Sequence, residues 1–225
     1  METGLFAKMQ LAANEYMLIL NPHEELRGRI QLLKKQFHDA YPAPGGSAAA
    51  GAKPHLTLVR FTQLALMEER IIQRLRVIAM GYCPFKVELK DFGSFPTHTI
   101  YLQVTSKLPI RGLLTEIREA QRLMRLDKDR KPHFMEEPHI PIARKLLPWQ
   151  YEKGWQEYEK KSFTGRFVAD GMLLLKRRAA DVTDGPATGG RDAWASRAWQ
   201  ISERFAFQNL PVATKQGQLF SLPRA

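Results

Sequence analysis

Two short segments of the sequence resemble each other, and each carries a histidine directly after a proline. The first reads Lys-Pro-His55-Leu-Thr57-Leu-Val-Arg-Phe, and the second reads Glu-Pro-His139-Ile-Pro141-Ile-Ala-Arg. An imidazole with its ordinary pKa of about 6.5 changes charge close to neutral pH. One histidine of such a pair can therefore take a proton from a nucleophile while the other donates a proton to a leaving oxygen. This chemistry suits the cleavage or formation of a phosphodiester and requires no metal ion.

The residues around each histidine predict how its side chain is presented. If the first segment is a strand, alternation places His55, Thr57 and Val59 on one face and the two leucines on the other. The second segment separates His139 and Pro141 from two isoleucines in the same way. We expect the leucine and isoleucine faces to enter the core. Two strands related by pseudo-symmetry would then bring both histidines into one cleft.

The second segment lacks one group that the first one has. The hydroxyl of Thr57 is suited to donate to a non-bridging phosphate oxygen, whereas Pro141 has neither a hydroxyl nor a backbone N–H. Losing one transition-state donor costs on the order of 10²–10³ in rate, so a slow enzyme, a substitute ligand and a pure binding protein all remain open. Our preferred substitute is Arg144, although simple alternation puts it on the face opposite His139 unless the strand ends or bends there.

Aromatic residues supply candidates for contact with a nucleobase. Tyr16 and Phe61 are predicted to bind substrate by stacking on a base, as aromatic side chains do in single-stranded RNA sites; the alternative is that they belong to the core. Several more aromatic residues lie within residues 148–160. Their helical spacing is explained by packing against a sheet, without any ligand.

No metal site and no cofactor is predicted. The chain has one cysteine, Cys83, and it has neither a His-x-x-x-His pattern nor clustered carboxylates, whereas zinc needs about four close ligands. The other four histidines are assigned to helix ends, loops or strand entry: His23, His38, His98 and His133.

The elements expected around the two segments mix strands with helices. Strands are predicted at residues 15–20, 54–61, 85–92, 99–104, 138–144, 163–177 and 199–207. Helices are predicted at residues 22–40, 66–79, 110–126 and 148–160, the first of them capped by Asn21 with Pro22 at its first position. This mixture indicates an α+β fold. No glycine-rich turn leads from a strand into a helix, so Rossmann and P-loop folds are excluded.

Composition and charge bound the remaining possibilities. The chain has 34 Lys and Arg against 23 Asp and Glu, a net charge of +11, which attracts polyanions such as nucleic acid; scattered positive charge also fits a role in solubility alone. No apolar run approaches the roughly 20 residues that span a bilayer, and the amino terminus lacks a secretory pattern. We expect a cytoplasmic monomer that does not contact a membrane.

Taken together, these features resemble the 2H phosphoesterase superfamily, in its 2',5' RNA ligase-like and cyclic phosphodiesterase branch. The signature of that family is a pair of His-x-Thr/Ser motifs, and here 84 residues separate His55 from His139. The resemblance also covers the opening strand with Tyr16, Asp91-Phe-Gly-Ser-Phe-Pro, and Trp-Gln-Ile-Ser-Glu-Arg-Phe near the end. It implies a bilobal, pseudo-symmetric fold with two antiparallel sheets lining a central groove and helices outside.

The resemblance also implies the domain organisation and the activity. Residues 14–208 would form one bilobal domain with loops at 42–53, expected to be mobile, and at 181–192. Residues 1–13 would be an extension, and residues 209–225 a tail. The activity implied is on 2',3'-cyclic phosphates or 2',5' linkages, at RNA ends or in small nucleotides, with His55, Thr57 and His139 as the catalytic residues.

Several alternatives stay open at this stage. Hydrolysis and ligation use the same two proton transfers in opposite directions, and either histidine is able to serve as the acid. A non-catalytic protein that binds RNA or nucleotides is the second hypothesis, because of Pro141. A protein-interaction domain is the third, and it requires the two histidines to lie far apart.

Overall fold

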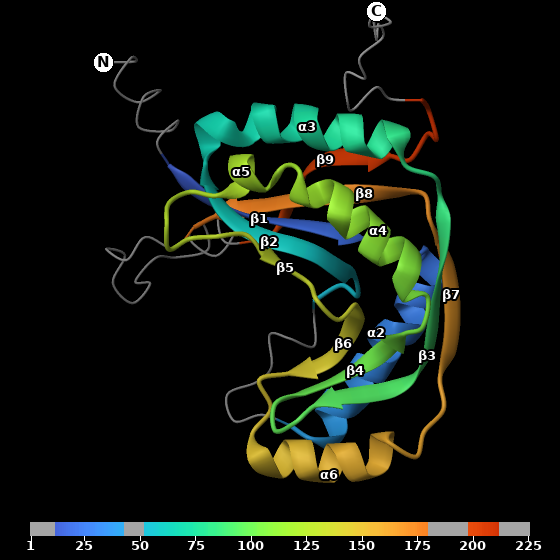
Figure 1. Ribbon diagram of the computed structural model, residues 1–225. Coiled ribbons are helices and arrows are strands. Elements are labelled where there is room, and N and C mark those ends of the chain that lie inside the picture. The colour runs from blue at the N-terminus through green and yellow to red at the C-terminus, as the bar shows by residue number, and fades with distance from the viewer. Residues whose placement is uncertain (1–11, 43–51, 180–197, 212–225) are drawn as a thin grey trace, which may run out of the picture.

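The computed structural model describes residues 12–42, 52–179 and 198–211. They form a five-stranded sheet and a four-stranded sheet, all of whose paired strands are antiparallel. Figure 1 shows the two sheets curving around a concave side, with α3 and α6 at opposite outer ends. The predicted α+β, bilobal architecture is confirmed. The loop predicted at 181–192 lies outside the described residues, as do most of the predicted extension, loop 42–53 and tail.

The five-stranded sheet contains the first histidine segment. Its strand order is β5-β2-β1-β8-β9, and the strands are β1 (Ala13–Leu20), β2 (Leu56–Leu64), β5 (His133–Phe134), β8 (Gly171–Arg178) and β9 (Gln200–Ala206). The helices beside this sheet are α3 (Glu68–Gly81), which a 3-10 turn (Ala65–Met67) introduces, α4 (Lys107–Arg118) and α5 (Gln121–Met124).

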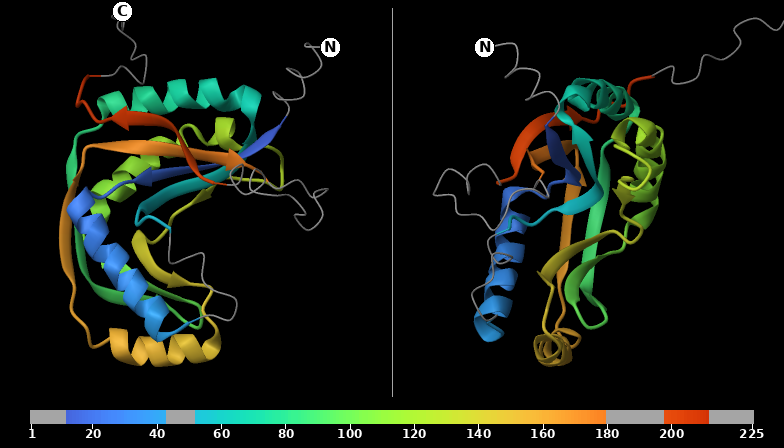
Figure 2. Two further views of the ribbon diagram at one scale, coloured as in Figure 1. Left: turned by 180° about the vertical axis from the view of Figure 1, so that it is seen from behind. Right: turned by 90° about the vertical axis from the view of Figure 1, so that its left-hand side faces the viewer.

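The four-stranded sheet contains the second histidine segment. Its order is β6-β4-β3-β7, and the strands are β3 (Phe85–Phe95), β4 (Thr99–Val104), β6 (His139–Arg144) and β7 (Thr164–Ala169). Helix α2 (Glu24–Ala40) packs against β6 and β7, and α6 (Pro148–Tyr158) packs against β4. Figure 2 shows both helices outside this sheet. Strands β2 and β6 contact each other, so the two motif strands lie next to one another.

One hydrophobic core joins the two lobes. A helix is predicted at 110–126, and its apolar face is buried in this core at Ile110, Leu113, Leu114 and Ile117. That helix ends at Arg118, however, and a separate short helix follows. The apolar pattern predicted the buried face correctly, but it did not show the break between the two helices.

Three boundaries differ from the predictions. Helix α2 begins at Glu24 with His23 at its N-cap, so Asn21 and Pro22 precede it. Strand β3 continues to Phe95, beyond the predicted end at residue 92. The single strand predicted at 163–177 is two strands: β7 pairs with β3, whereas β8 pairs with β1 in the other sheet. This segment therefore crosses from one lobe to the other.

Candidate active site

The two histidines are held by the same local hydrogen bond. The Nδ1 of His55 lies 2.8 Å from the carbonyl oxygen of Lys53, and the Nδ1 of His139 lies 2.7 Å from that of Glu137. A carbonyl oxygen only accepts, so each Nδ1 must donate. In a neutral imidazole this leaves the Nε2 lone pair free to accept a proton. The sequence repeat therefore corresponds to a repeated side-chain geometry.

Burial lowers the pKa of both imidazoles and so favours their neutral forms. Burial, reinforced by the positive charges of Arg144, Lys34 and Arg60, lowers the pKa of His55 to about 4. Burial and Arg144 also lower the pKa of His139, against the opposing effect of Glu137. Because Arg144 acts on both histidines, its charge links the two motifs.

His139 is fixed by aromatic neighbours. Its ring lies 4.9 Å from that of Tyr101 and 5.0 Å from that of Phe95, centroid to centroid, and the residue is only 8% exposed. Tyr101 in turn lies over Gly93, its partner on β3. A Cβ at position 93 would lie 2.6 Å from the Tyr101 ring, so this packing requires a glycine.

A β-bulge in β2 changes which residues share a face with Thr57. Thr57 pairs with Ile19 and Val59 pairs with Leu18, so Leu58 is one extra residue. Beyond the bulge the alternation is reversed, which explains why Val59 is fully buried instead of sharing the face of Thr57 as predicted. Arg60 shares that face instead. The predicted burial of the two leucines is confirmed.

The hydroxyl of Thr57 makes only a weak hydrogen bond, and the residue is 8% exposed. Its one described hydrogen bond is to the sulfur of Met17, at 3.8 Å, and thioether sulfur is a weak acceptor. A phosphate oxygen would be a stronger partner for the same hydroxyl.

A second β-bulge, in β6, determines the position of Arg144. Pro141 pairs with Tyr101 and Ala143 pairs with Ile100, so Ile142 is one extra residue. Arg144, which pairs with Thr99, consequently lies on the same face as His139 and Pro141. The strand bends where the predicted role of Arg144 required a bend.

One pocket at the contact between the lobes collects the basic residues. Its lining residues are Lys34, Ala52, Lys53, Pro54, His55, Pro141, Ile142 and Arg144. The predicted residues His55 and Arg144 are thus brought together from different sheets. Neither His139 nor Thr57 is part of this lining. This pocket has a volume of only about 20 Å³. A larger cavity of 670 Å³ lies beside the start of α2, and neither motif histidine lines it.

Lys34 is a pocket-lining residue that the sequence predictions missed. It is only 5% exposed, on the buried face of α2 with Leu26, Ile30 and Phe37. The sequence does contain a signal of this burial. Lys34 falls four residues after Ile30 and three before Phe37, which is the spacing of side chains on one face of a helix. A lysine on such a buried face needs a reason to be there, since buried charges are costly.

The predicted roles of Tyr16 and Phe61 are corrected. Tyr16 is 1% exposed and Phe61 is 5% exposed. Their rings stack on each other with centroids 5.1 Å apart, and the Tyr16 hydroxyl donates to Glu68 of α3 at 3.0 Å. The register puts both side chains on the core face of their sheet, so neither has a ring face free to stack on a base.

Within residues 12–42, 52–179 and 198–211, no group of three or more His, Cys, Asp or Glu side chains is arranged to hold a metal ion. In the same part of the chain, no helix is both long and apolar enough to cross a membrane.

The fold has two lobes, and each contains one of the two histidine motifs. A family model described as the 2'-5' RNA ligase superfamily matches residues 22–181. The chain belongs to this superfamily, within the 2H phosphoesterases. This membership removes the argument for an unrelated interaction domain.

Solved structures share the fold at low sequence identity. The Thermus thermophilus protein TT0787 has a TM-score of 0.55 and 16% identity, over 86% of this chain and 98% of that one. E. coli LigT complexed with 3'-AMP gives 0.55 and 16%, over 87% and 98%, and LigT complexed with phosphate gives 0.51 and 14%, over 87% and 98%. No match to this chain was found among curated proteins. At these identities the likeness shows the fold alone.

Proposed function

We propose that the protein is a metal-independent phosphoesterase that acts on 2',3'-cyclic phosphates or 2',5' linkages at RNA ends or in small nucleotides. His55 and His139 exchange protons with the substrate, while Thr57 and Arg144 hold the phosphate. The observation that carries this proposal is the pocket that unites His55 of one lobe with Arg144 of the other, because Arg144 also acts on His139.

The electrostatic differences between the histidines support an assignment of roles. His55 has the lower affinity for a proton, with a pKa of about 4, and so is available as the general base. His139 is the general acid, because Glu137 raises its pKa against the effect of burial. In hydrolysis of a cyclic phosphate, water loses a proton to Nε2 of His55 and its oxygen bonds to phosphorus. His139 protonates the ribose oxygen as the phosphorus–oxygen bond to it breaks.

The substrate supplies the charge that this mechanism needs. A bound phosphate is negative and lies among Arg144, Lys34 and the two imidazoles. Its charge offsets the cations that lower the histidine pKa values and favours the protonated form of His139. Substrate binding therefore prepares the acid for catalysis.

A half-buried tryptophan supports a nucleotide as the organic part of the substrate. The guanidinium carbons of Arg60 and Arg177 lie 5.9 and 4.6 Å from the ring centroid of Trp199. The register places both arginines on the Thr57 face of their sheet. Aromatic rings with arginines are the side chains that stack on RNA bases. We assign to Trp199 the role predicted for Tyr16 and Phe61; LigT, the fold relative, binds 3'-AMP.

The second candidate function is binding without turnover, and Pro141 favours it. This residue occupies the pocket where the family pattern has a hydroxyl. We prefer the enzyme because His55 and Arg144 line the same pocket and Arg144 also lowers the pKa of His139.

Turnover of a 2',3'-cyclic nucleotide and of RNA with a cyclic phosphate end, in EDTA, tests the proposal. Wild type should hydrolyse at least one of them, and His55→Ala and His139→Ala should each lose activity by on the order of 10²–10⁴. Equal nucleotide binding by all three proteins with no turnover in any would replace the enzyme with the binding protein.

A further inference from the structure

Lys34 belongs to neither histidine motif, yet it lines the same pocket as His55 and Arg144. It lies on α2, a helix that packs against β6. Its Nζ donates to the backbone carbonyl of Ala52, three residues before His55. The ammonium group is thus buried at the place where the two lobes meet.

The described residues provide this charge with no counter-ion. None of the ion pairs in that part of the chain includes Lys34 or Arg144. The charged or titratable groups that act on Lys34 and Arg144, or on which they act, are each other, His55, His139, Arg60 and His38. Buried charges in proteins are normally paired with an opposite charge. Lys34 is such a buried charge, at 5% exposed, whereas Arg144 is an exposed residue at the mouth of the same pocket. A pocket that places this unneutralised lysine beside an arginine is suited to an anion.

We propose that Lys34 and Arg144 form a two-cation clamp that selects a phosphoryl group with two negative charges over one with a single charge. This inference rests on the proposed function, since it names the charge state that the same site favours. The arginine fork binds phosphate oxygens bidentately, and the lysine adds a point charge.

The proposed reaction creates such a dianion. A cyclic phosphodiester carries one negative charge, and water that loses its proton to His55 adds a second one as its oxygen bonds to phosphorus. The product is a phosphomonoester, whose charge at pH 7 is about −1.5 to −2. A clamp for two charges binds the transition state and product more strongly than the substrate, and so assists the chemical step. Product inhibition is its consequence.

Calorimetry with a matched pair of ligands tests the clamp. 2'-Deoxyadenosine 3'-monophosphate and its 3'-methyl ester differ by one charge, and neither has a 2'-hydroxyl that can react. Wild type should bind the monoester at least about tenfold more tightly, as expected for one charge-assisted contact. Lys34→Met should remove most of that preference, and Lys34→Arg should keep it.

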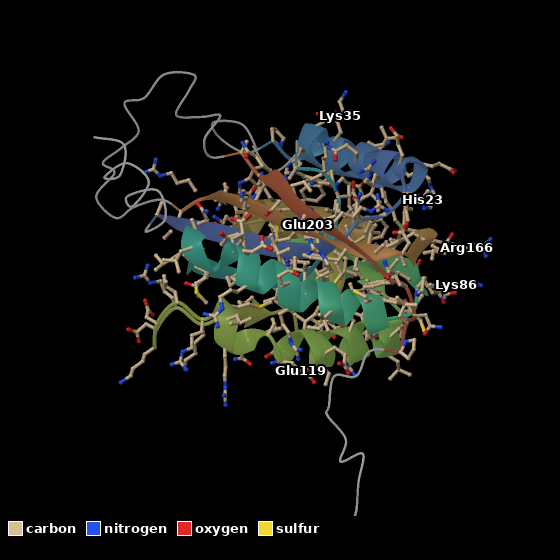
Figure 3. All side chains as sticks on the ribbon, turned by 90° about the horizontal axis from the view of Figure 1, so that it is seen from above. His23, Lys35, Lys86, Glu119, Arg166 and Glu203 are labelled. Atoms are coloured by element: carbon tan, nitrogen blue, oxygen red, sulfur yellow. The ribbon has the colours of Figure 1, made fainter. Side chains whose placement is uncertain are left out.

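Two further variants separate the charge of Lys34 from a structural role. Lys35→Met is the matched control, because Lys35 projects outward from the same helix (Figure 3) and is exposed. It should bind both ligands like wild type. Lys34→Gln keeps a neutral donor for the carbonyl of Ala52, so recovery of the preference in this variant would overturn the clamp. A melting temperature of Lys34→Met at or above that of wild type supports a functional charge, since a structural lysine would lower it.

The outcomes distinguish the clamp from the enzymatic proposal. Discrimination between the ligands without turnover of cyclic phosphates by wild type would keep the clamp and reject the enzyme. Turnover of cyclic phosphates by a wild type that binds the two ligands equally would keep the enzyme and reject the clamp. The same conclusion would follow if Lys34→Met lost affinity for both ligands by the same factor.

Discussion

Arg144 lies on the same face of β6 as His139 because one extra residue, Ile142, stands between them in the ladder with β4. The bulge turns a surface position of a regular strand into a lining position of the pocket. The same arginine lowers the pKa of both motif histidines. Arg144 is therefore the residue through which the two lobes share one electrostatic site.

Replacing Arg144 tests this sharing. Arg144→Gln should raise the pKa of both histidines, because its positive charge disfavours their protonation, and should lower kcat/KM by on the order of 10²–10³. The histidine proton signals followed by NMR across pH measure the first effect. Arg166→Gln is the control, since Arg166 is exposed at the periphery (Figure 3). If the pKa values of both histidines were unchanged in Arg144→Gln, Arg144 would not link the two motifs electrostatically.

The pH dependence of turnover should differ between free and occupied enzyme. In the free enzyme the base His55 loses its proton near pH 4, and His139 loses its proton below 6.5. The profile of kcat/KM should therefore be a bell whose alkaline limb falls below pH 6.5. The alkaline limb of kcat should lie at higher pH, because the bound phosphate raises the pKa of His139. Coincident alkaline limbs would contradict this assignment.

Restoring the missing hydroxyl should increase activity. Pro141 is on an edge strand, where proline is tolerated and threonine is a good strand residue. Pro141→Thr should raise kcat by up to about 10²-fold, the value of one transition-state donor. Pro141→Val has a similar shape without the hydroxyl and should show no such gain. Equal rates in both variants would mean that position 141 does not face the reacting phosphate.

The packing behind His139 predicts a substitution that acts at a distance. Gly93→Ala would put a methyl group 2.6 Å from the ring of Tyr101, which must move and release His139. We expect a loss of stability of about 1–3 kcal/mol from overpacking, with a lower kcat. Gly28→Ala is the matched control, since nothing lies within 4 Å of its Cβ position. In helix α2 that change should stabilise by about 0.5–1 kcal/mol, as urea unfolding would measure.

Stability at alkaline pH reports the cost of burying Lys34. Burial and Arg144 lower its pKa from 10.5 to about 8, so the unfolded chain binds a proton that the folded protein lacks between these values. Stability should consequently rise with pH from about 8 to 10.5, by on the order of 3 kcal/mol. Comparison of wild type with Lys34→Met in chemical denaturation isolates this contribution. The same slope in both proteins would contradict it.

Local patterns in the sequence predicted much of the fold, and two of the candidate site residues, His55 and Arg144, line one pocket. The apolar residues that flank the two histidines entered the core as expected, since alternation holds over short strands. The α+β class followed from the mixture of periods, and the family resemblance supplied the bilobal arrangement.

The remaining features depend on contacts that a linear pattern does not contain. Bulges at Leu58 and Ile142 reverse the alternation, and only the partner strand determines where such an extra residue is placed. Strands β7 and β8 read as one because both are extended and apolar, although they pair in different sheets. Lys34 was overlooked because its apolar surroundings come from α2 and β6 together.

The central claim is that His55 and His139 act as a unit on one phosphate, and a double-mutant cycle tests it most directly. Single-turnover rates on a 2',3'-cyclic nucleotide should fall by a similar large factor in His55→Ala and His139→Ala. The double variant should be little slower than either, because residues that act as a unit are not additive. A double variant whose loss equals the product of the two single losses would show that the histidines act independently, and would contradict the account.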